Sequence, residues 1–397
     1  MKKLISIFIY LMIPFFLMDC SNDNPPTAPN DISDGYTYKV PEQTDDGWET
    51  ASLSDVGVDP TIITNLMNDL NNRDHYIHSI VIVKNGKLVL EEYFSGRDVE
   101  LDEQIAGSGE LKYTNKNFNC NTLHFLGSAN KCIWSALIGI GIDKGFINGT
   151  DEKMFSYFPD YEDLNDSEKN KITIAHMLTM TSGLPWDDGS YPIYDPRNDE
   201  YQMLFNKDPI RFVLEKPIVN SPGTNFHYNS GTTFLLSEII KRSTGKSWEE
   251  FAEQYLFNPL GITSYRWSSS RNMRNTFYAA GLYLTPRDMA KFGQVFLDKG
   301  LWNANLIVSE RWTLESSSES IHFPTVHLPM PKFITGYGYQ WWVGNFNNVT
   351  DIYCAAGWGG QFIMVLPDVN MTIVFTSGDY EENNFKLQFD TVNDFRR

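Results

Sequence analysis

A serine and a lysine lie three residues apart at the start of an apolar segment. Ser128 and Lys131 belong to the stretch GSANK at 127–131, and the apolar run 132–140 follows directly. On a helix, residues three apart lie on one face, so we expect the Lys131 amine to reach the Ser128 hydroxyl. The run that follows is apolar on nearly every side, which predicts a buried helix. Because burial disfavours the ammonium form of a lysine, Lys131 is predicted to act as the base that activates Ser128 as a nucleophile.

The Ser-x-x-Lys spacing by itself also fits an N-cap serine followed by a lysine whose amine extends to solvent. The same spacing occurs again at Ser243 and Lys246, where Gly245 and polar neighbours favour a loop over a continuing helix. We interpret this second copy as coincidental. Two further segments favour nucleophilic chemistry at Ser128.

The first of these segments, residues 221–231, carries Tyr228 in the sequence SPGTNFHYNSG. Its Pro-Gly pair marks a turn, and the apolar positions after it predict a helix. Tyr228 therefore lies on a short loop, where side chains face clefts more often than cores. The alternative is a buried tyrosine with a hydrogen-bond partner.

The second segment, residues 355–361, reads AAGWGGQ and leads into an apolar strand. Glycines at the start of a strand let a ligand or another backbone approach closely. A backbone N–H there is a candidate for one half of an oxyanion hole. The alternative is a glycine bulge at the strand entry.

Together these three segments resemble the serine β-lactamase and penicillin-recognising hydrolase superfamily. The resemblance is closest to the class C branch, which includes family VIII esterases and 6-aminohexanoate-oligomer hydrolases. It extends from about residue 53 to about residue 378 and includes the segments 140–145, 172–184 and 257–262 in the family's order. The resemblance implies an α+β fold of the β-lactamase/D-Ala-D-Ala-peptidase type, with an antiparallel sheet flanked by helices and an inserted, mostly helical subdomain.

The resemblance also implies a serine hydrolase that cleaves an ester or amide bond through an acyl-enzyme. Ser128 would be the nucleophile, and Lys131 and Tyr228 would share the transfer of its proton, with the general base unassigned between them. The backbone N–H groups of Ser128 and Gln361 would form the oxyanion hole. The expected substrate-binding residues are Ser230, Trp358, Gly359 and Gly360.

Two motifs depart from the class C pattern. Where that branch has Tyr-x-Asn, this chain ends the motif at Ser230, and where it has Lys-Thr-Gly or His-Thr-Gly, this chain has Trp358, Gly359 and Gly360. A tryptophan carries no charge to hold a β-lactam carboxylate, and serine offers a shorter contact than asparagine. Trp-Gly-Gly resembles the esterase and amidase branches, which argues against efficient antibiotic hydrolysis.

Two alternative functions remain open at this point. One is a penicillin-binding protein, D-amino-acid peptidase or weak β-lactamase that uses the same serine. The other is a non-catalytic surface protein that binds a peptide or a glycan with a retained fold.

Composition excludes several function classes. The chain has 50 acidic and 32 basic residues and a net charge of −18, so it repels phosphate backbones and is not expected to bind nucleic acid. No group of cysteines and histidines has metal-ligand spacing, so we expect neither a metal nor a cofactor.

The N-terminus is typical of an exported protein. Lys2 and Lys3 precede the apolar stretch 4–18, so we interpret residues 1–19 as a signal peptide. The sequence LMDC at 17–20 resembles a bacterial lipoprotein cleavage box, which makes Cys20 the lipidated residue and residues 20–47 a flexible tether. We therefore expect a periplasmic or cell-surface lipoprotein that is anchored in a membrane by its lipid. Secretion with a different cleavage point is the alternative.

The remaining residues, 48–397, are predicted to form the hydrolase domain. Strands are expected at 77–84 and 87–94, joined by an Asn-Gly hairpin turn, and again at 338–343, 361–366 and 371–376. Strands from both ends of the chain must then share one sheet. This places the α/β part at 48–127 and 280–397 and the helical part at 128–279, with Ser128 where the two parts meet.

Overall fold

The computed structural model describes residues 35–99, 111–187, 189–268, 281–322, 330–331, 333–346, 350–381, 388–389 and 391. The predicted signal peptide, Cys20 and most of the predicted tether lie outside these residues. None of the helices in the described ranges is long and apolar enough to cross a bilayer.

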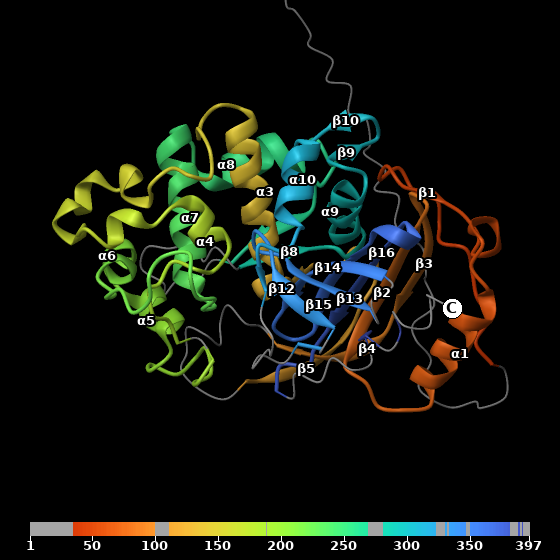
Figure 1. The fold of residues 1–397 in the computed structure, drawn as a ribbon. Helices are drawn as coiled ribbons and strands as arrows, with labels where there is room; N and C mark the ends of the chain where they lie inside the picture. Colours follow the sequence, from red (N-terminus) through yellow and green to blue (C-terminus); the bar gives the residue numbers. More distant parts are fainter. Residues whose placement is uncertain are drawn as a thin grey trace, which may run out of the picture.

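Within the described residues, a nine-stranded sheet forms the centre of the molecule (Figure 1). Neighbouring strands are antiparallel, except that β1 runs parallel to β3. The order across the sheet is β1 (Glu49–Thr50), β3 (Lys87–Tyr93), β2 (Ile77–Lys84), β16 (Met371–Ser377), β15 (Gln361–Leu366), β14 (Thr350–Gly357), β13 (Trp342–Phe346), β12 (Ile334–Tyr337) and β11 (Ile321–His322). The expectation that strands from both ends of the chain share one sheet is confirmed.

The hairpin predicted from Asn-Gly is present, and a second hairpin joins β15 to β16. Between β2 and β3, Asn85 and Gly86 both have positive φ (54° and 73°), as a type I′ turn requires. Between β15 and β16, a 3-10 turn (Pro367–Val369) ends at Asn370, whose φ is 47°. Both turns fix the register of the strands that they join.

The prediction of one strand over 338–343 is wrong, because β12 ends at Tyr337 and β13 begins at Trp342. Gln340 lies in the turn between them with a φ of 68°. Its buried side chain donates to the carbonyl of Leu178 at 2.9 Å and accepts from the Thr233 hydroxyl at 2.9 Å. These long-range contacts hold the turn, and an apolar pattern cannot reveal them.

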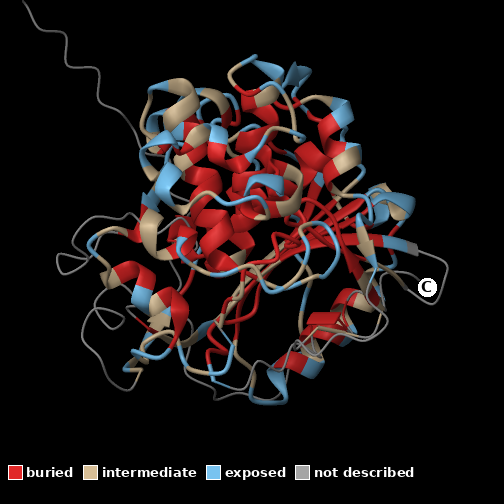
Figure 2. Cartoon of the chain, turned by 60° about the vertical axis from the view of Figure 1, so that its left-hand side comes forward, coloured by how far each residue is buried: buried red, intermediate tan, exposed pale blue. Residues whose placement is uncertain are grey.

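Side chains alternate between the two faces of the sheet, and each face has its own core. On β2, Val81 and Val83 pack with α3 and α9, whereas Ile80 and Ile82 pack with α1. Figure 2 shows the buried residues concentrated in the sheet and in the helices against it. The helices involved are α1 (Pro60–Asn71), α3 (Asn130–Asp143), α9 (Pro286–Leu297) and α10 (Glu310–Ser316).

The segment between the two sets of sheet strands is mostly helical. It contains α3 and, after it, α4 (Ile174–Leu178), α5 (Asp199–Phe205), α6 (Pro209–Leu214), α7 (Ser230–Thr244) and α8 (Trp248–Ala252). Helix α3 is buried from Asn130 to Gly141, as its apolar sequence predicts, and it packs against α7 and β14. Helix α7 ends at Gly245, whose φ is 69°, so the second Ser-x-x-Lys copy lies at a helix end.

Short strands complete the described structure. Strands β4 (Ser95–Val99) and β5 (Tyr113–Asn117) pair with each other, as do β9 (Leu301–Trp302) and β10 (Asn305–Leu306). Strands β6 (His124–Phe125) and β7 (Tyr265–Trp267) both pair with β8 (Leu282–Leu284), which ties the segment before Ser128 to the segment before α9.

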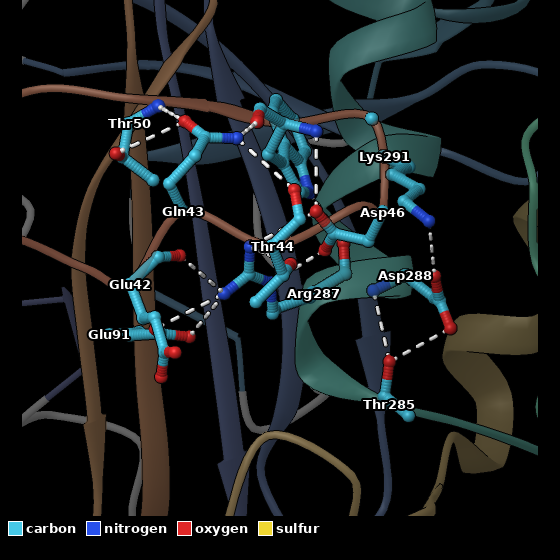
Figure 3. Close-up of polar contacts among 12 residues, drawn as sticks. Glu42, Gln43, Thr44, Asp46, Thr50, Glu91, Thr285, Arg287, Asp288 and Lys291 are labelled. Atoms are coloured by element: carbon cyan, nitrogen blue, oxygen red, sulfur yellow. Dashed lines mark hydrogen bonds and ion pairs between the residues drawn. The ribbon is translucent and has the colours of Figure 1, made fainter. Parts of the chain in front are cut away.

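The part of the predicted tether that is described is bound to the domain (Figure 3). The guanidinium of Arg287, on α9, donates to Asp46 at 2.7 Å and to Glu91, on β3, at 3.1 Å. The Arg287 side chain is only 5% exposed. This buried charge cluster fastens the chain near residue 46 to the helix and the sheet edge.

The C-terminal segment contacts the sheet through Phe389. This side chain is buried and packs edge-on against Phe362 of β15 and against Phe333. The spacing of Phe385, Phe389, Val392 and Phe395 predicts one apolar face of a helix, but the other three positions lie outside the described residues.

Candidate active site

The predicted pair, Ser128 and Lys131, meets at the start of α3. Ser128 lies on a single 3-10 turn, Gly127–Ala129, and the α-helix begins at Asn130. The Lys131 Nζ donates to the Ser128 Oγ at 3.0 Å. Ser128 is half-buried, whereas Lys131 is 2% exposed. The structure therefore brings together a reachable hydroxyl and an amine that is shielded from water.

Tyr228 completes this group from the loop before α7. The Lys131 Nζ lies 4.9 Å from the centroid of the Tyr228 ring, and the ring stacks on Trp342 at 5.8 Å. Asn229, the next residue, is fully buried and caps α7 by accepting from the backbone N–H of Thr232 at 3.0 Å. The helix cap thus determines where the loop places Tyr228.

The backbone of the β14–β15 turn packs directly against the segment that carries Ser128. A Cβ on Gly357 would lie 2.0 Å from the Leu126 carbonyl oxygen, and a Cβ on Gly127 would lie 3.0 Å from the Trp358 backbone nitrogen. Across the described part of the chain, the Trp358 backbone N–H has no hydrogen-bond acceptor. A hydrogen-bond donor is therefore available beside the turn of Ser128.

Gln361, whose backbone N–H is the predicted second oxyanion donor, belongs to a strand that contacts the turn of Ser128. It begins β15, is fully buried, and does not line the cavity next to Ser128. Its side-chain amide donates to the Ser377 carbonyl at 2.6 Å and accepts from the Ser377 N–H at 3.2 Å. The backbone nitrogen that lies beside Gly127 is that of Trp358, a residue that the sequence suggests only for substrate binding.

A cavity of about 630 Å³ opens next to Ser128 and Tyr228. Much of its wall is aromatic, formed by Phe125, Tyr191, Tyr194, Trp342, Trp358 and Tyr380. Glu200 and Glu381 supply carboxylates, and no lysine or arginine is found among the described residues of the lining. The aromatic residues other than Trp358 were not identified from the sequence, because nothing local to segments 191–194 or 380–381 indicates that they reach Ser128.

Of the four predicted substrate-binding residues, only Trp358 lines the cavity. Its indole N–H donates to the Tyr380 carbonyl at 3.0 Å, which holds the ring against the wall. Ser230 is buried as the first residue of α7. Gly359 and Gly360 shape the turn: the Gly359 carbonyl accepts from the Asp379 N–H at 3.1 Å, and the Gly360 N–H donates to the Gly357 carbonyl at 3.1 Å.

The described residues contain no group of three or more histidines, cysteines, aspartates or glutamates that could hold a metal ion. The groups beside the cavity that can act chemically are the Ser128 hydroxyl, the Lys131 amine, the Tyr228 phenol and backbone N–H donors.

Comparison with known proteins gives one family across most of the chain. The profile of the family described as Beta-lactamase matches residues 74–392. Protein flp of Staphylococcus aureus (strain N315) is 26% identical over 194 residues, which cover 49% of this chain and 35% of flp. The chain thus matches only about a third of the length of that relative.

Two solved structures share the fold. The octameric penicillin-binding protein homologue from Pyrococcus abyssi superposes with a TM-score of 0.61 at 17% identity, covering 84% of this chain and 76% of that one. A family VIII carboxylesterase superposes with a TM-score of 0.59 at 14% identity, covering 83% of this chain and 96% of the esterase chain. At these identities the likeness shows the fold alone.

Proposed function

The chain belongs to the Beta-lactamase family, and from this premise we propose that it is a serine hydrolase that cleaves a carboxylic ester or amide through an acyl-enzyme. The observation that carries the proposal is the 3.0 Å contact between the Lys131 amine and the Ser128 hydroxyl at the edge of a cavity. An activated serine needs an adjacent base within hydrogen-bond reach. A protein that only binds a peptide or a glycan needs no such pair.

The reaction proceeds in two halves. The Ser128 Oγ attacks the substrate carbonyl carbon while its proton passes to the pair formed by Lys131 and Tyr228. The tetrahedral intermediate then expels the leaving group, which takes up that proton. Water attacks the resulting acyl-enzyme, gives its proton to the same pair, and releases the acid as Ser128 regains its hydrogen.

The oxyanion that forms in each half needs two hydrogen-bond donors. We assign them to the backbone N–H groups of Ser128 and Trp358, because Trp358 lies beside Gly127 and its N–H has no acceptor in the described part of the chain. One such donor typically stabilises the transition state by about 3 kcal/mol. The backbone N–H of Gln361, expected from the sequence to be the second donor, is the alternative to that of Trp358.

The cavity wall favours substrates without a carboxylate near the scissile bond. Its described lining contains Glu200 and Glu381 but no lysine or arginine, and its aromatic side chains suit an apolar acyl group. A β-lactam or a peptide with a free C-terminal carboxylate would meet no compensating positive charge in that lining. A neutral ester or amide is therefore the substrate class that we propose.

Labelling with a fluorophosphonate probe tests the proposal. We expect one covalent adduct, on the peptide that contains Ser128, and none in Ser128→Ala. Ser243→Ala is the matched control, since Ser243 belongs to the second Ser-x-x-Lys copy and its hydroxyl bonds the Ile240 carbonyl; it should label like the natural protein. Absence of an adduct on Ser128 in the folded natural protein would support a binding role instead.

We also propose that the protein is exported and held at a membrane by lipid on Cys20, which follows the apolar stretch 4–18. Metabolic labelling with a radioactive fatty acid should mark the natural protein and not Cys20→Ser. Equal labelling of both would place the lipid elsewhere, and no label in either would favour simple secretion.

A further inference from the structure

One buried methionine holds an unusual backbone conformation next to the Tyr228 loop. Met180 follows α4 and has a φ of 57°, although its side chain is fully buried. The left-handed region is unfavourable for an L-residue, so a non-glycine residue remains there only when surrounding contacts impose it. The contacts of Met180 show what this conformation is used for.

Met180 accepts hydrogen bonds from both residues that flank Tyr228. Its carbonyl oxygen accepts from the His227 backbone N–H at 2.8 Å. Its Sδ accepts from the Asn229 backbone N–H at 3.3 Å, and the Thr232 hydroxyl lies 3.9 Å from the same sulfur. One residue therefore fixes the chain immediately before and immediately after Tyr228.

The hydrogen bonds of Met180 belong to a longer series between the segment after α4 and the segment before α7. The Gly183 carbonyl accepts from the Val219 N–H at 2.9 Å, and the Thr181 carbonyl accepts from the Gly223 N–H at 2.8 Å. The series aligns residues 180–183 with residues 219–227. Among these hydrogen bonds, those made by Met180 lie next to the loop of Tyr228.

We propose that Met180 is a positioning residue for Tyr228, and this inference rests on the proposed hydrolase function. By bonding the backbone on both sides, Met180 keeps the phenol beside the Lys131 amine. Without the sulfur, the Asn229 N–H would be buried and would lose this acceptor, which favours a shift of the loop. Small shifts of a catalytic group can lower a rate substantially.

The test compares Met180→Leu with Met180→Gln, in natural and Tyr228→Phe backgrounds. Leucine keeps the apolar volume but offers no acceptor, whereas the glutamine side chain offers a carbonyl at similar length, and both keep the same backbone strain. For p-nitrophenyl butyrate we expect kcat/KM to fall about tenfold in Met180→Leu and to recover most of that loss in Met180→Gln. Met177→Leu is the control, because Met177 is equally buried but belongs to the other core, and its rate should be unchanged.

The Tyr228→Phe background separates positioning from general loss of structure. If Met180 acts through Tyr228, Met180→Leu should lower kcat/KM by less than about twofold in the Tyr228→Phe background, because the effects of coupled residues do not add. A tenfold loss in both backgrounds, or no loss in either, would overturn the inference. If Met180→Leu does not fold, Met180→Gly, which removes both the strain and the sulfur, takes its place in the same cycle.

The two proposals fail in different ways. If Tyr228→Phe by itself left kcat/KM unchanged, the proposed role of Tyr228 in the hydrolase mechanism would be wrong. If Tyr228→Phe lowers kcat/KM but Met180→Leu does not, only the positioning role of Met180 is overturned.

Discussion

The Lys131 amine lies 3.0 Å from the Ser128 hydroxyl, although the Lys131 side chain is almost completely shielded from solvent. A buried amine in this position can accept the serine proton and return it to the leaving group. We therefore expect Lys131→Met to lower kcat for p-nitrophenyl butyrate by about 10²–10⁴-fold. Lys131→Arg should be no better, because a guanidinium stays protonated and cannot act as a base. Activity of the arginine variant near the natural level would mean that Lys131 supplies charge rather than proton transfer.

Gly127 controls the approach of the two proposed oxyanion donors. An added methyl group would lie 3.0 Å from the Trp358 nitrogen, at a position whose φ is 54°. Gly127→Ala should separate Ser128 from Trp358 and lower kcat by about 10²-fold, the cost of one lost donor. Gly145→Ala is the matched control, because Gly145 also has positive φ (76°) but has open space around its Cβ position. The Gly145→Ala variant should be less stable but should keep its kcat. Equal kcat values in the two variants would show that Trp358 is not an oxyanion donor.

The charge of the cavity wall predicts discrimination between two esters of similar size. Mono-p-nitrophenyl succinate differs from p-nitrophenyl butyrate mainly by a carboxylate, which Glu200 and Glu381 would repel. We expect its kcat/KM to be at least about tenfold lower, an effect that added salt should reduce. Glu381→Gln should reduce the difference in kcat/KM between the two esters, because it removes one carboxylate and the ion-pair partner that Arg97 contacts at 3.3 Å. A succinate ester hydrolysed as fast as the butyrate would contradict the proposed substrate class.

The positions of the three proposed catalytic residues follow from the sequence more directly than those of the groups that surround them. Ser128 and Lys131 share one helical turn, and Tyr228 precedes a helix whose cap is visible in the sequence, so local patterns place all three. The choice between the backbone N–H groups of Gln361 and Trp358 as the second donor depends on the register of the β14–β15 hairpin, which local patterns do not fix. In the structure Gly357 pairs with Gln361, which leaves Trp358 in the turn.

The cavity wall could not be predicted for a similar reason. Tyr191 and Tyr380 reach the same cavity from segments almost two hundred residues apart, and neither segment carries a local motif. Likewise, the turn at Gln340 depends on contacts with Leu178 and Thr233. Patterns of period two or 3.6 report local geometry, whereas these positions are set by tertiary contacts.

The Arg287 cluster should contribute to stability rather than to catalysis, since none of its residues lines the cavity. Removing a buried cation leaves Asp46 and Glu91 uncompensated (Figure 3). Arg287→Leu should therefore destabilise the fold by about 3–5 kcal/mol, measured by chemical denaturation. At low temperature the folded variant should keep its kcat. A loss of kcat without a loss of stability would connect this cluster to the active site.

Two buried histidines predict that stability falls on mild acidification. The rings of His78 and His124 share a hydrogen bond of 3.0 Å, and burial lowers the pKa of each to about 3. An unfolded histidine titrates near 6.5, so between about pH 6.5 and 3 the unfolded chain binds more protons and stability falls as pH falls. His78→Gln should flatten the decline in Tm between pH 6.5 and 5. The same slope in both proteins would show that other groups cause it.

The most direct test of the central claim is hydrolysis of p-nitrophenyl butyrate by residues 35–397 of the natural sequence and by the Ser128→Ala variant of the same length. We expect steady hydrolysis by the first protein and a rate no higher than background for the second, provided that circular dichroism shows the variant to be folded. Equal hydrolysis by both proteins would contradict the assignment of Ser128 as the nucleophile.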